Sequence, residues 1–191
     1  PKIFRGKNPP SLPFNMRHDL FPTPLWHIEG GPQELIDELY QGAYRFKKQH
    51  PSNQLTNFGG YQSPGFDWKD FHPQGIEYIQ HVIKETFTEI ESAYGHLKPI
   101  NWWYNINSQG NWNVPHTHPN SDFALVLYLT DSDGLLCLTN PHSQRGIDKQ
   151  NTAVNAQKGD IVIFPSDIWH YVMPNPREED RISISMNLRL L

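Results

Sequence analysis

The sequence predicts an α+β protein in which N-terminal helices support a β-rich half that folds as a sandwich or jelly roll. Two segments of the first half carry apolar residues at helical spacing. After residue 97, short runs rich in β-branched and aromatic residues alternate with turn residues, which is typical of antiparallel strands rather than βαβ units. A length of 191 residues suits one domain. We therefore expect a single domain over 1–191, with helical support and an extended arm at 1–97 and a jelly-roll core at 98–191.

The composition is that of a folded, cytoplasmic protein. Aromatic residues make up 13% of the chain, which argues against disorder despite a mean hydropathy of −0.65. The net charge of −4, without a basic run, argues against nucleic-acid binding. No apolar run approaches about 20 residues and no leader pattern is visible, so neither membrane insertion nor secretion is expected. Cys137 is the single cysteine, which excludes an internal disulfide.

The first elements are an arm, a short strand and a helix. Prolines crowd residues 1–24 and predict an extended arm, which could reach a neighbouring copy, so homo-oligomerisation stays open. A strand is expected around Thr23–Glu29. A helix is expected between Pro32 and Pro51, because apolar residues recur at three- and four-residue spacing: Leu35, Ile36, Leu39, Ala43 and Phe46.

A loop and a second helix follow. Residues 51–72 are rich in Asn, Ser, Gly and aromatic residues, which favours a long loop. The second helix is expected over Pro73–Tyr94, with Gly95 ending it. Its apolar stripe, which predicts a core-packing face, consists of Ile76, Ile79, Ile83, Phe87 and Ile90.

The β-rich half contains several short strands. The final segment, Arg181–Arg189, alternates polar and apolar residues strictly, which predicts one buried face and one face toward a cavity or solvent. The expected strands are Ile100–Ile106, Phe123–Leu129, Gly134–Leu138, Asp160–Phe164 and Arg181–Arg189.

Three histidines suggest a metal site. His116 and His118 are two residues apart on an extended segment, so their side chains point to the same side. His170 follows an apolar strand and a turn, and supplies a third candidate ligand. Two ligands from one strand and a third from another build a facial site that leaves positions open for substrate and oxygen.

A second group of residues suits a carboxylate. Arg181 and Ser183 share one strand face, and a guanidinium beside a hydroxyl binds a carboxylate well. Tyr128 supplies a third donor from the strand after the histidine pair. Asn105 and Asn107 share a face of the strand that leads into the histidine motif, and are candidates for cofactor or substrate binding.

These motifs resemble the Fe(II)- and 2-oxoglutarate-dependent oxygenases. The order His116, His118, His170, Arg181 and Ser183 resembles their signature of His-x-Asp/Glu, a distant His and Arg-x-Ser. The stretch "GDIVIFPSDIWHYV" is similar to their distal histidine region, and "NINSQGNWNVPHTHPNSDFALVLYL" is similar to a bacterial and phage branch with an HxHP string.

The resemblance implies a fold, a cofactor set and a reaction. The fold is a cupin-like double-stranded β-helix with the metal at its open end. Iron and 2-oxoglutarate are the implied cofactors, with the far carboxylate of 2-oxoglutarate on Arg181 and Ser183. The implied reaction consumes molecular oxygen, releases succinate and CO2, and hydroxylates a peptide side chain or a small molecule.

One position departs from the family pattern, because His118 stands where a carboxylate is usual. Three alternatives follow for the metal: the three histidines bind it together, Asp122 swings in as a ligand, or His118 and His170 bind it with Asn120 or water. Two other functions stay open beside the oxygenase. One is a cupin-like three-histidine dioxygenase without 2-oxoglutarate, and the other is a non-catalytic jelly-roll binding module.

Overall fold

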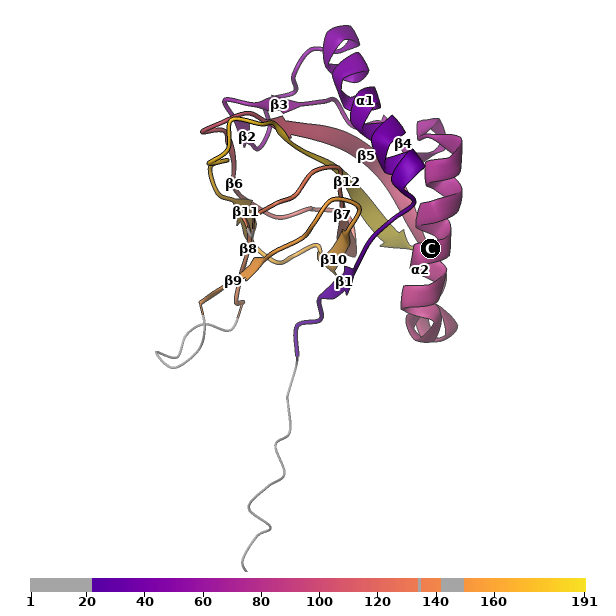
Figure 1. Cartoon of the computed structure of the whole chain (residues 1–191). Coiled ribbons are helices and arrows are strands. Elements are labelled where there is room, and N and C mark those ends of the chain that lie inside the picture. The colour runs from indigo at the N-terminus through magenta and orange to yellow at the C-terminus, as the bar shows by residue number, and fades with distance from the viewer. Residues whose placement is uncertain (1–21, 134, 142–149) are drawn as a thin grey trace, which may run out of the picture.

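The computed structural model describes residues 22–133, 135–141 and 150–191; the expectations for residues 1–21 and for Gly134 lie outside these ranges. Within them, two antiparallel sheets face each other (Figure 1). In spatial order, the larger sheet contains β1 (Trp26–Ile28), β10 (Ile161–Pro165), β7 (Phe123–Tyr128), β12 (Arg181–Leu190), β5 (Leu97–Asn107) and β3 (Tyr61–Gln62), with β4 (Phe66–Asp67) also on β5. The smaller sheet contains β2 (Asn57–Phe58), β6 (Trp112–His116), β11 (His170–Val172), β8 (Leu136–Thr139) and β9 (Asn151–Val154).

Both predicted helices are present and cover the outer face of the larger sheet (Figure 1). Helix α1 spans Gln33–Gln49 and α2 spans Pro73–Tyr94. Helix α1 ends because His50, which precedes Pro51, has extended backbone angles (φ −128°, ψ 135°). Helix α2 ends at Gly95, whose φ of 111° is readily adopted only by glycine.

Strict alternation along β5, β7 and β12 divides the larger sheet into two faces. The even-numbered residues of β12, the even-numbered residues of β5 from Trp102 on and the odd-numbered residues of β7 join the core beneath the helices. Before Trp102 the register of β5 against β12 shifts, and the odd-numbered Leu97 joins the same core. That core is large and hydrophobic, and its sheet side includes Trp102, Ile106, Leu125, Leu127, Ile182, Ile184 and Met186. The opposite face of the same strands points between the two sheets. It is the face that carries the polar residues of β5 and β12.

A smaller apolar cluster lies between the sheets. It includes Ala124, Tyr128, Leu136, Val154, Val162, Phe164 and Ile168. Because this cluster fills only part of the space between the sheets, the remaining part is open to polar side chains. The site described below occupies that part.

The prediction of a long loop over residues 51–72 is wrong in part. This segment contains β2, β3, β4 and a 3-10 turn over Trp68–Asp70. Each of these strands has only two residues, too few to produce an alternating pattern in the sequence. Their conformation is set by their partners β5 and β6, which is information that a local pattern does not contain.

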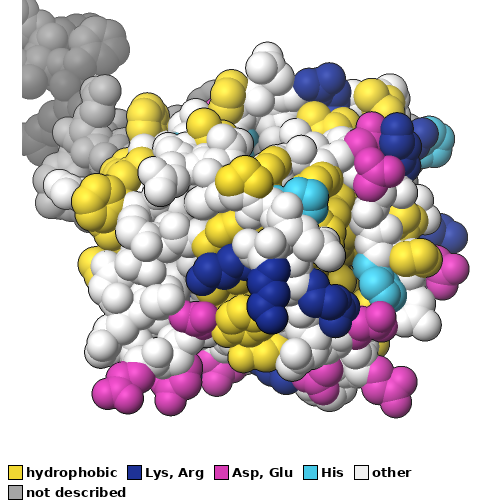
Figure 2. All heavy atoms as spheres, turned by 90° about the horizontal axis from the view of Figure 1, so that it is seen from above, with side chains coloured by type: hydrophobic (Ala, Val, Ile, Leu, Met, Phe, Trp, Pro, Cys, Tyr) yellow, Lys and Arg dark blue, Asp and Glu magenta, His cyan; other side chains and the backbone are white. Residues whose placement is uncertain are grey.

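Charged residues of both signs share the surface. Figure 2 shows Lys and Arg side chains gathered near the middle of one face, with Asp and Glu side chains mostly toward its edge. In the part of the chain that is described, no helix combines the length and the apolar character needed to cross a bilayer.

Candidate metal centre

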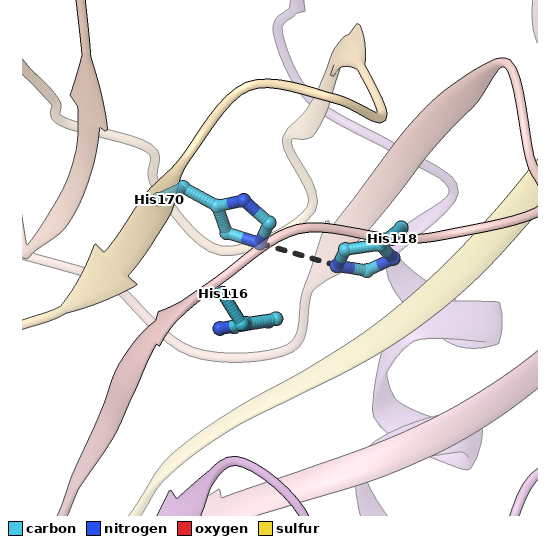
Figure 3. A group of neighbouring side chains, drawn as sticks. All are labelled: His116, His118 and His170. Carbon is cyan, nitrogen blue, oxygen red and sulfur yellow. Dashed lines mark hydrogen bonds between the residues drawn. The ribbon is translucent and has the colours of Figure 1, made fainter.

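His116 and His170, on neighbouring strands of the smaller sheet, meet His118 in the cavity between the two sheets. His116 is the last residue of β6 and His170 is the first residue of β11, and the two are directly paired across these strands. His118 lies on the segment after β6. Its backbone N–H donates to the carbonyl of Ser166 (2.8 Å), which holds this segment against the turn before β11. Figure 3 shows the three side chains close together, with a dashed line between the rings of His118 and His170.

Each imidazole is oriented by a hydrogen bond at Nδ1. The Nδ1 atoms of His116 and His170 lie 2.7 Å and 2.9 Å from the backbone carbonyls of Val114 and Ile168. The Nδ1 atom of His118 lies 2.6 Å from Asn187 Oδ1. Because all three partners are oxygen acceptors, each neutral ring carries its proton on Nδ1. The three Nε2 lone pairs are therefore left for another partner.

The ligand atoms converge closely enough for one ion. Candidate ligand nitrogens of the three histidines lie within 4.8 Å of one another. His118 Nε2 and His170 Nε2 are 3.1 Å apart (Figure 3). Two unprotonated nitrogens at this distance repel each other, and a cation between them converts that repulsion into coordination. The donor set thus fits a transition metal ion that prefers imidazole.

Burial keeps these rings neutral. It lowers the pKa of His118 to about 4 and that of His170 to about 3, because the charged ring would lose its hydration. The pKa of His116 is also lowered, again mainly by burial. Neutral imidazole is the form that binds a metal, so the site is ready for an ion at neutral pH.

The other candidate ligands lie elsewhere. Asp122 Oδ2 accepts a hydrogen bond from the backbone N–H of Leu190 (2.8 Å), and the residue is not part of the metal-binding group. Asn120 is exposed, with a left-handed φ of 64°. The structure therefore favours the alternative in which the three histidines form the group, and separates Asp122 and Asn120 from it.

The predicted carboxylate-binding residues line the same cavity as the histidines. Arg181, Ser183 and Tyr128 are all on its wall, and Ser183 is paired directly with Tyr128 across β12 and β7. The guanidinium of Arg181 is buried. Its Nη1 donates to the carbonyl of Met173 (3.1 Å), whereas its Nη2 has no partner among the described residues. Burial lowers the pKa of Arg181 to about 10, so the side chain remains a cation at neutral pH.

An unpaired buried N–H is costly, which makes Arg181 Nη2 informative. It requires an acceptor that the described protein residues do not supply. A carboxylate satisfies it best, because a carboxylate also compensates the charge. Burial raises the pKa of the neighbouring Tyr128 hydroxyl, which therefore stays protonated as a hydrogen-bond donor.

The two predicted asparagines lie on the cavity wall but differ in their bonding. Asn105 Nδ2 donates to Ser185 Oγ (3.1 Å), while its Oδ1 is buried without a partner among the described residues. Asn107 has both amide atoms engaged: Oδ1 accepts from Asn57 (2.5 Å) and Nδ2 donates to Asn113 (2.8 Å). Asn107 thus ties β2 and β6 to β5, and Asn105 is the one with a free acceptor.

Sequence reasoning did not identify Asn187, the partner of His118. The signal was present, because Asn187 is on the same face of the alternating segment as Arg181 and Ser183. Trp103, whose ring centroid is 5.5 Å from that of His118, lines the cavity from β5 in the same way. Period-two alternation on β5 and β12 therefore locates the supporting residues of the site as well as its principal ones.

Comparisons with known proteins identify a matching family model and similar folds. Residues 101–187 match the model of a family described as "Putative 2OG-Fe(II) oxygenase". No curated protein is significantly similar to the chain in sequence. Similar solved structures include a prolyl-4-hydroxylase from Pseudomonas putida, with a TM-score of 0.67 and 14% identity over 88% of this chain and 94% of that one.

Two further structures have the same fold. A viral collagen prolyl hydroxylase from Paramecium bursaria Chlorella virus-1, in complex with 2-oxoglutarate, has a TM-score of 0.63 and 15% identity over 87% of this chain and 96% of that one. AviO1 from Streptomyces viridochromogenes has a TM-score of 0.64 and 16% identity over 87% of this chain and 90% of that one. These similarities confirm the predicted fold class, an α+β protein with a double-stranded β-helix core and supporting N-terminal helices.

Proposed function

We propose that this chain, whose residues 101–187 match the 2OG-Fe(II) oxygenase family, is a non-haem Fe(II)- and 2-oxoglutarate-dependent dioxygenase. The expected resemblance to this superfamily is confirmed by that match. One observation carries the proposal: a cavity that contains three converging neutral imidazoles also contains a buried arginine with an unpaired N–H. A metal ion and a dicarboxylate fill these two needs together.

The residues have distinct roles in this proposal. His116, His118 and His170 hold the iron through Nε2. Arg181, Ser183 and Tyr128 bind the far carboxylate of 2-oxoglutarate. When bound, the iron and 2-oxoglutarate supply the oxidising chemistry, in which O2 is consumed and succinate and CO2 are released. We propose that residues 1–191 form one domain that carries this activity; in its described part, the helices and the larger sheet share one core.

The protein residues bind, orient and exclude water. The Nδ1 hydrogen bonds fix each ring in one tautomer and one orientation. Phe164 packs edge-on against His170, with ring centroids 4.8 Å apart, and Trp103 lies beside His118. These aromatic walls limit water around the ligands, which strengthens the electrostatic attraction between metal and anion.

The proposed reaction is hydroxylation of a peptide side chain or a small molecule. We favour a peptidyl side chain such as proline, by analogy with the two prolyl hydroxylases of similar fold. A three-histidine dioxygenase without 2-oxoglutarate is the second candidate, because His118 replaces the usual carboxylate. The unpaired Nη2 of Arg181 favours the 2-oxoglutarate-dependent enzyme, because a dioxygenase without 2-oxoglutarate would leave this atom without a partner.

Anaerobic titration tests the proposal. Apo-protein is titrated with Fe(II) and then with 2-oxoglutarate, and the visible charge-transfer band of the chelate is followed. We expect the band in the wild type and in Lys69→Ala, which removes an exposed cation paired with Asp67, and its loss in Arg181→Ala. Iron binding without the band would favour the three-histidine dioxygenase. Absence of iron binding would overturn the enzyme assignment and leave a non-catalytic binding module.

A further inference from the structure

The cavity of the proposed metal centre has an unbalanced charge. Among the described residues that line it, Arg181 is a cation and none is an aspartate or glutamate. The other polar lining groups are neutral amides, hydroxyls and imidazoles. This inference rests on the proposed function, because it counts the charges of the metal and of 2-oxoglutarate.

The three metal ligands add no negative charge. Each imidazole is hydrogen-bonded to an oxygen acceptor through Nδ1 and is therefore a neutral ligand at Nε2. A divalent metal and Arg181 together bring three positive charges, and the dianion of 2-oxoglutarate cancels two of them. One positive charge remains in a largely buried cavity, where an uncompensated charge is strongly unfavourable.

Carboxylates of described residues approach this charge only from outside the cavity. Asp131, Glu179 and Asp180 share a neighbouring surface pocket with Arg181, but among the described residues none of them is paired with its guanidinium. Asp133 is near enough to act on Arg181, but its carboxylate is bound by Arg177. Asp160 accepts hydrogen bonds from the backbone N–H groups of Gly30 and Gln157 and contacts His27.

Asp122, the nearest acidic residue in sequence to the histidine pair, is also committed. It caps the backbone N–H of Leu190 at the end of β12. Among the described residues, no carboxylate therefore lines the cavity or joins the metal-binding group.

We propose that the cavity binds one small monovalent anion in addition to 2-oxoglutarate, and that His118 creates this requirement. The anion is a carboxylate of the substrate or an inorganic anion from solvent. An aspartate at position 118 would bring the charges of the loaded centre to zero and remove the need for it. His118 therefore determines the charge of what the centre accepts.

Azide is the probe that tests this. Co(II) is bound to the full chain, 2-oxoglutarate is added, and azide is titrated while the visible spectrum of cobalt is recorded. We expect azide to bind the wild type at least tenfold more tightly than His118→Asp. The neutral replacement His118→Gln, which keeps a side-chain oxygen able to bind the metal, is the matched control. At a cobalt concentration that saturates each protein, it is expected to bind azide within about threefold of the wild type. Imidazole is a neutral ligand. We expect its affinities for the wild type and His118→Asp to differ much less than the two azide affinities do.

A second variant keeps the test decisive if His118→Asp loses cobalt or does not fold. Arg181→Gln removes the other positive charge of the cavity, and is compared with the wild type on the cobalt form without 2-oxoglutarate. We expect azide to bind at least fivefold more weakly to this variant. Equal azide affinity in the wild type and the charge-reduced variants, or absence of azide binding to the wild type, would overturn the inference.

Two further measurements distinguish the source of the anion and test the proposed function on which this inference rests. Tighter binding of acetate than of chloride would assign the anion to a substrate carboxylate, and the reverse would assign it to solvent; either supports the proposal. If the 2-oxoglutarate band forms normally but azide affinity is the same in the wild type and the charge-reduced variants, this inference alone is wrong. Absence of that band would instead count against the proposed function.

Discussion

His116 and His170 are directly opposed residues on β6 and β11, and their ring centroids are 4.2 Å apart. They are far apart in sequence, and the strand register alone places them together. A metal ion bound by both rings therefore links two strands of the smaller sheet. The metal should therefore stabilise the fold in addition to its proposed role in the reaction.

Replacement of His170 by alanine is expected to abolish this link. Metal affinity should fall by at least a hundredfold, because one of the three imidazoles is lost. Adding Co(II) at 100 times the wild-type Kd stabilises the wild type by roughly 2.7 kcal/mol, and should stabilise His170→Ala by no more than about 0.4 kcal/mol. Differential scanning calorimetry with and without metal measures the unfolding midpoints of the wild type and of His170→Ala. His81→Ala, at an exposed position on α2, should respond to metal as the wild type does.

Asn187 is expected to act as a positioning residue for His118. Asn187→Ala removes the acceptor at 2.6 Å from His118 Nδ1, so the ring loses its fixed tautomer and orientation. We expect metal affinity to fall roughly 10–100-fold. Asn187→Asp keeps an acceptor oxygen at the same place and should retain affinity. A metal titration read by cobalt absorbance tests the pair, and equal losses in both variants would contradict the positioning role.

The buried histidines predict a pH dependence of the metal-free protein. Burial lowers the folded-state pKa of His118 to about 4 and that of His170 to about 3, whereas an unfolded histidine titrates near 6.5. Between these values the unfolded chain binds more protons, so stability falls as pH decreases below about 6.5 and is fully present above it. Urea midpoints at pH 7.5, 6 and 5 measure the slope.

A variant isolates the contribution of His118 to that slope. His118→Gln removes one titrating ring and should show a shallower decrease in urea midpoint on acidification. His81→Gln, which removes an exposed histidine, should keep the wild-type slope. Identical slopes in all three proteins would show that the buried ring does not control the acid response.

Gly95 is expected to tolerate no side chain. Its φ is 111°, and an added Cβ would lie 2.7 Å from the carbonyl oxygen of Leu191. We expect Gly95→Ala to lower the free energy of unfolding by about 1–3 kcal/mol. Gly65→Ala is the matched control, because an added Cβ there would meet no heavy atom within 4 Å and the φ of Gly65 is ordinary. Urea denaturation of the two variants provides the comparison, and equal stabilities would refute the strain argument.

The pairing of His116 with His118 and the final strand were predictable because each follows from alternation. The two-residue spacing of His116 and His118 predicts that both side chains lie on the same face. The strict alternation of Arg181–Arg189 predicts which face of the strand each side chain occupies. The pairing of segments that are distant in the sequence was harder to predict from local patterns. The short strands β2, β3 and β9 and the bond between His118 and Asn187 depend on which segments lie side by side. The choice among Asp122, Asn120 and His118 likewise needed the path of the turn after β6.

The division of β12 into two faces has a consequence for how this protein can diverge. Its even-numbered residues face the core beneath the helices, and its odd-numbered residues Arg181, Ser183, Ser185 and Asn187 face the cavity or its ligands. Substitutions at odd positions can therefore alter ligand preference while the hydrophobic packing is conserved. Selection for stability and selection for specificity act on separate residues of one strand, so a lineage can acquire a new substrate without first repairing its fold.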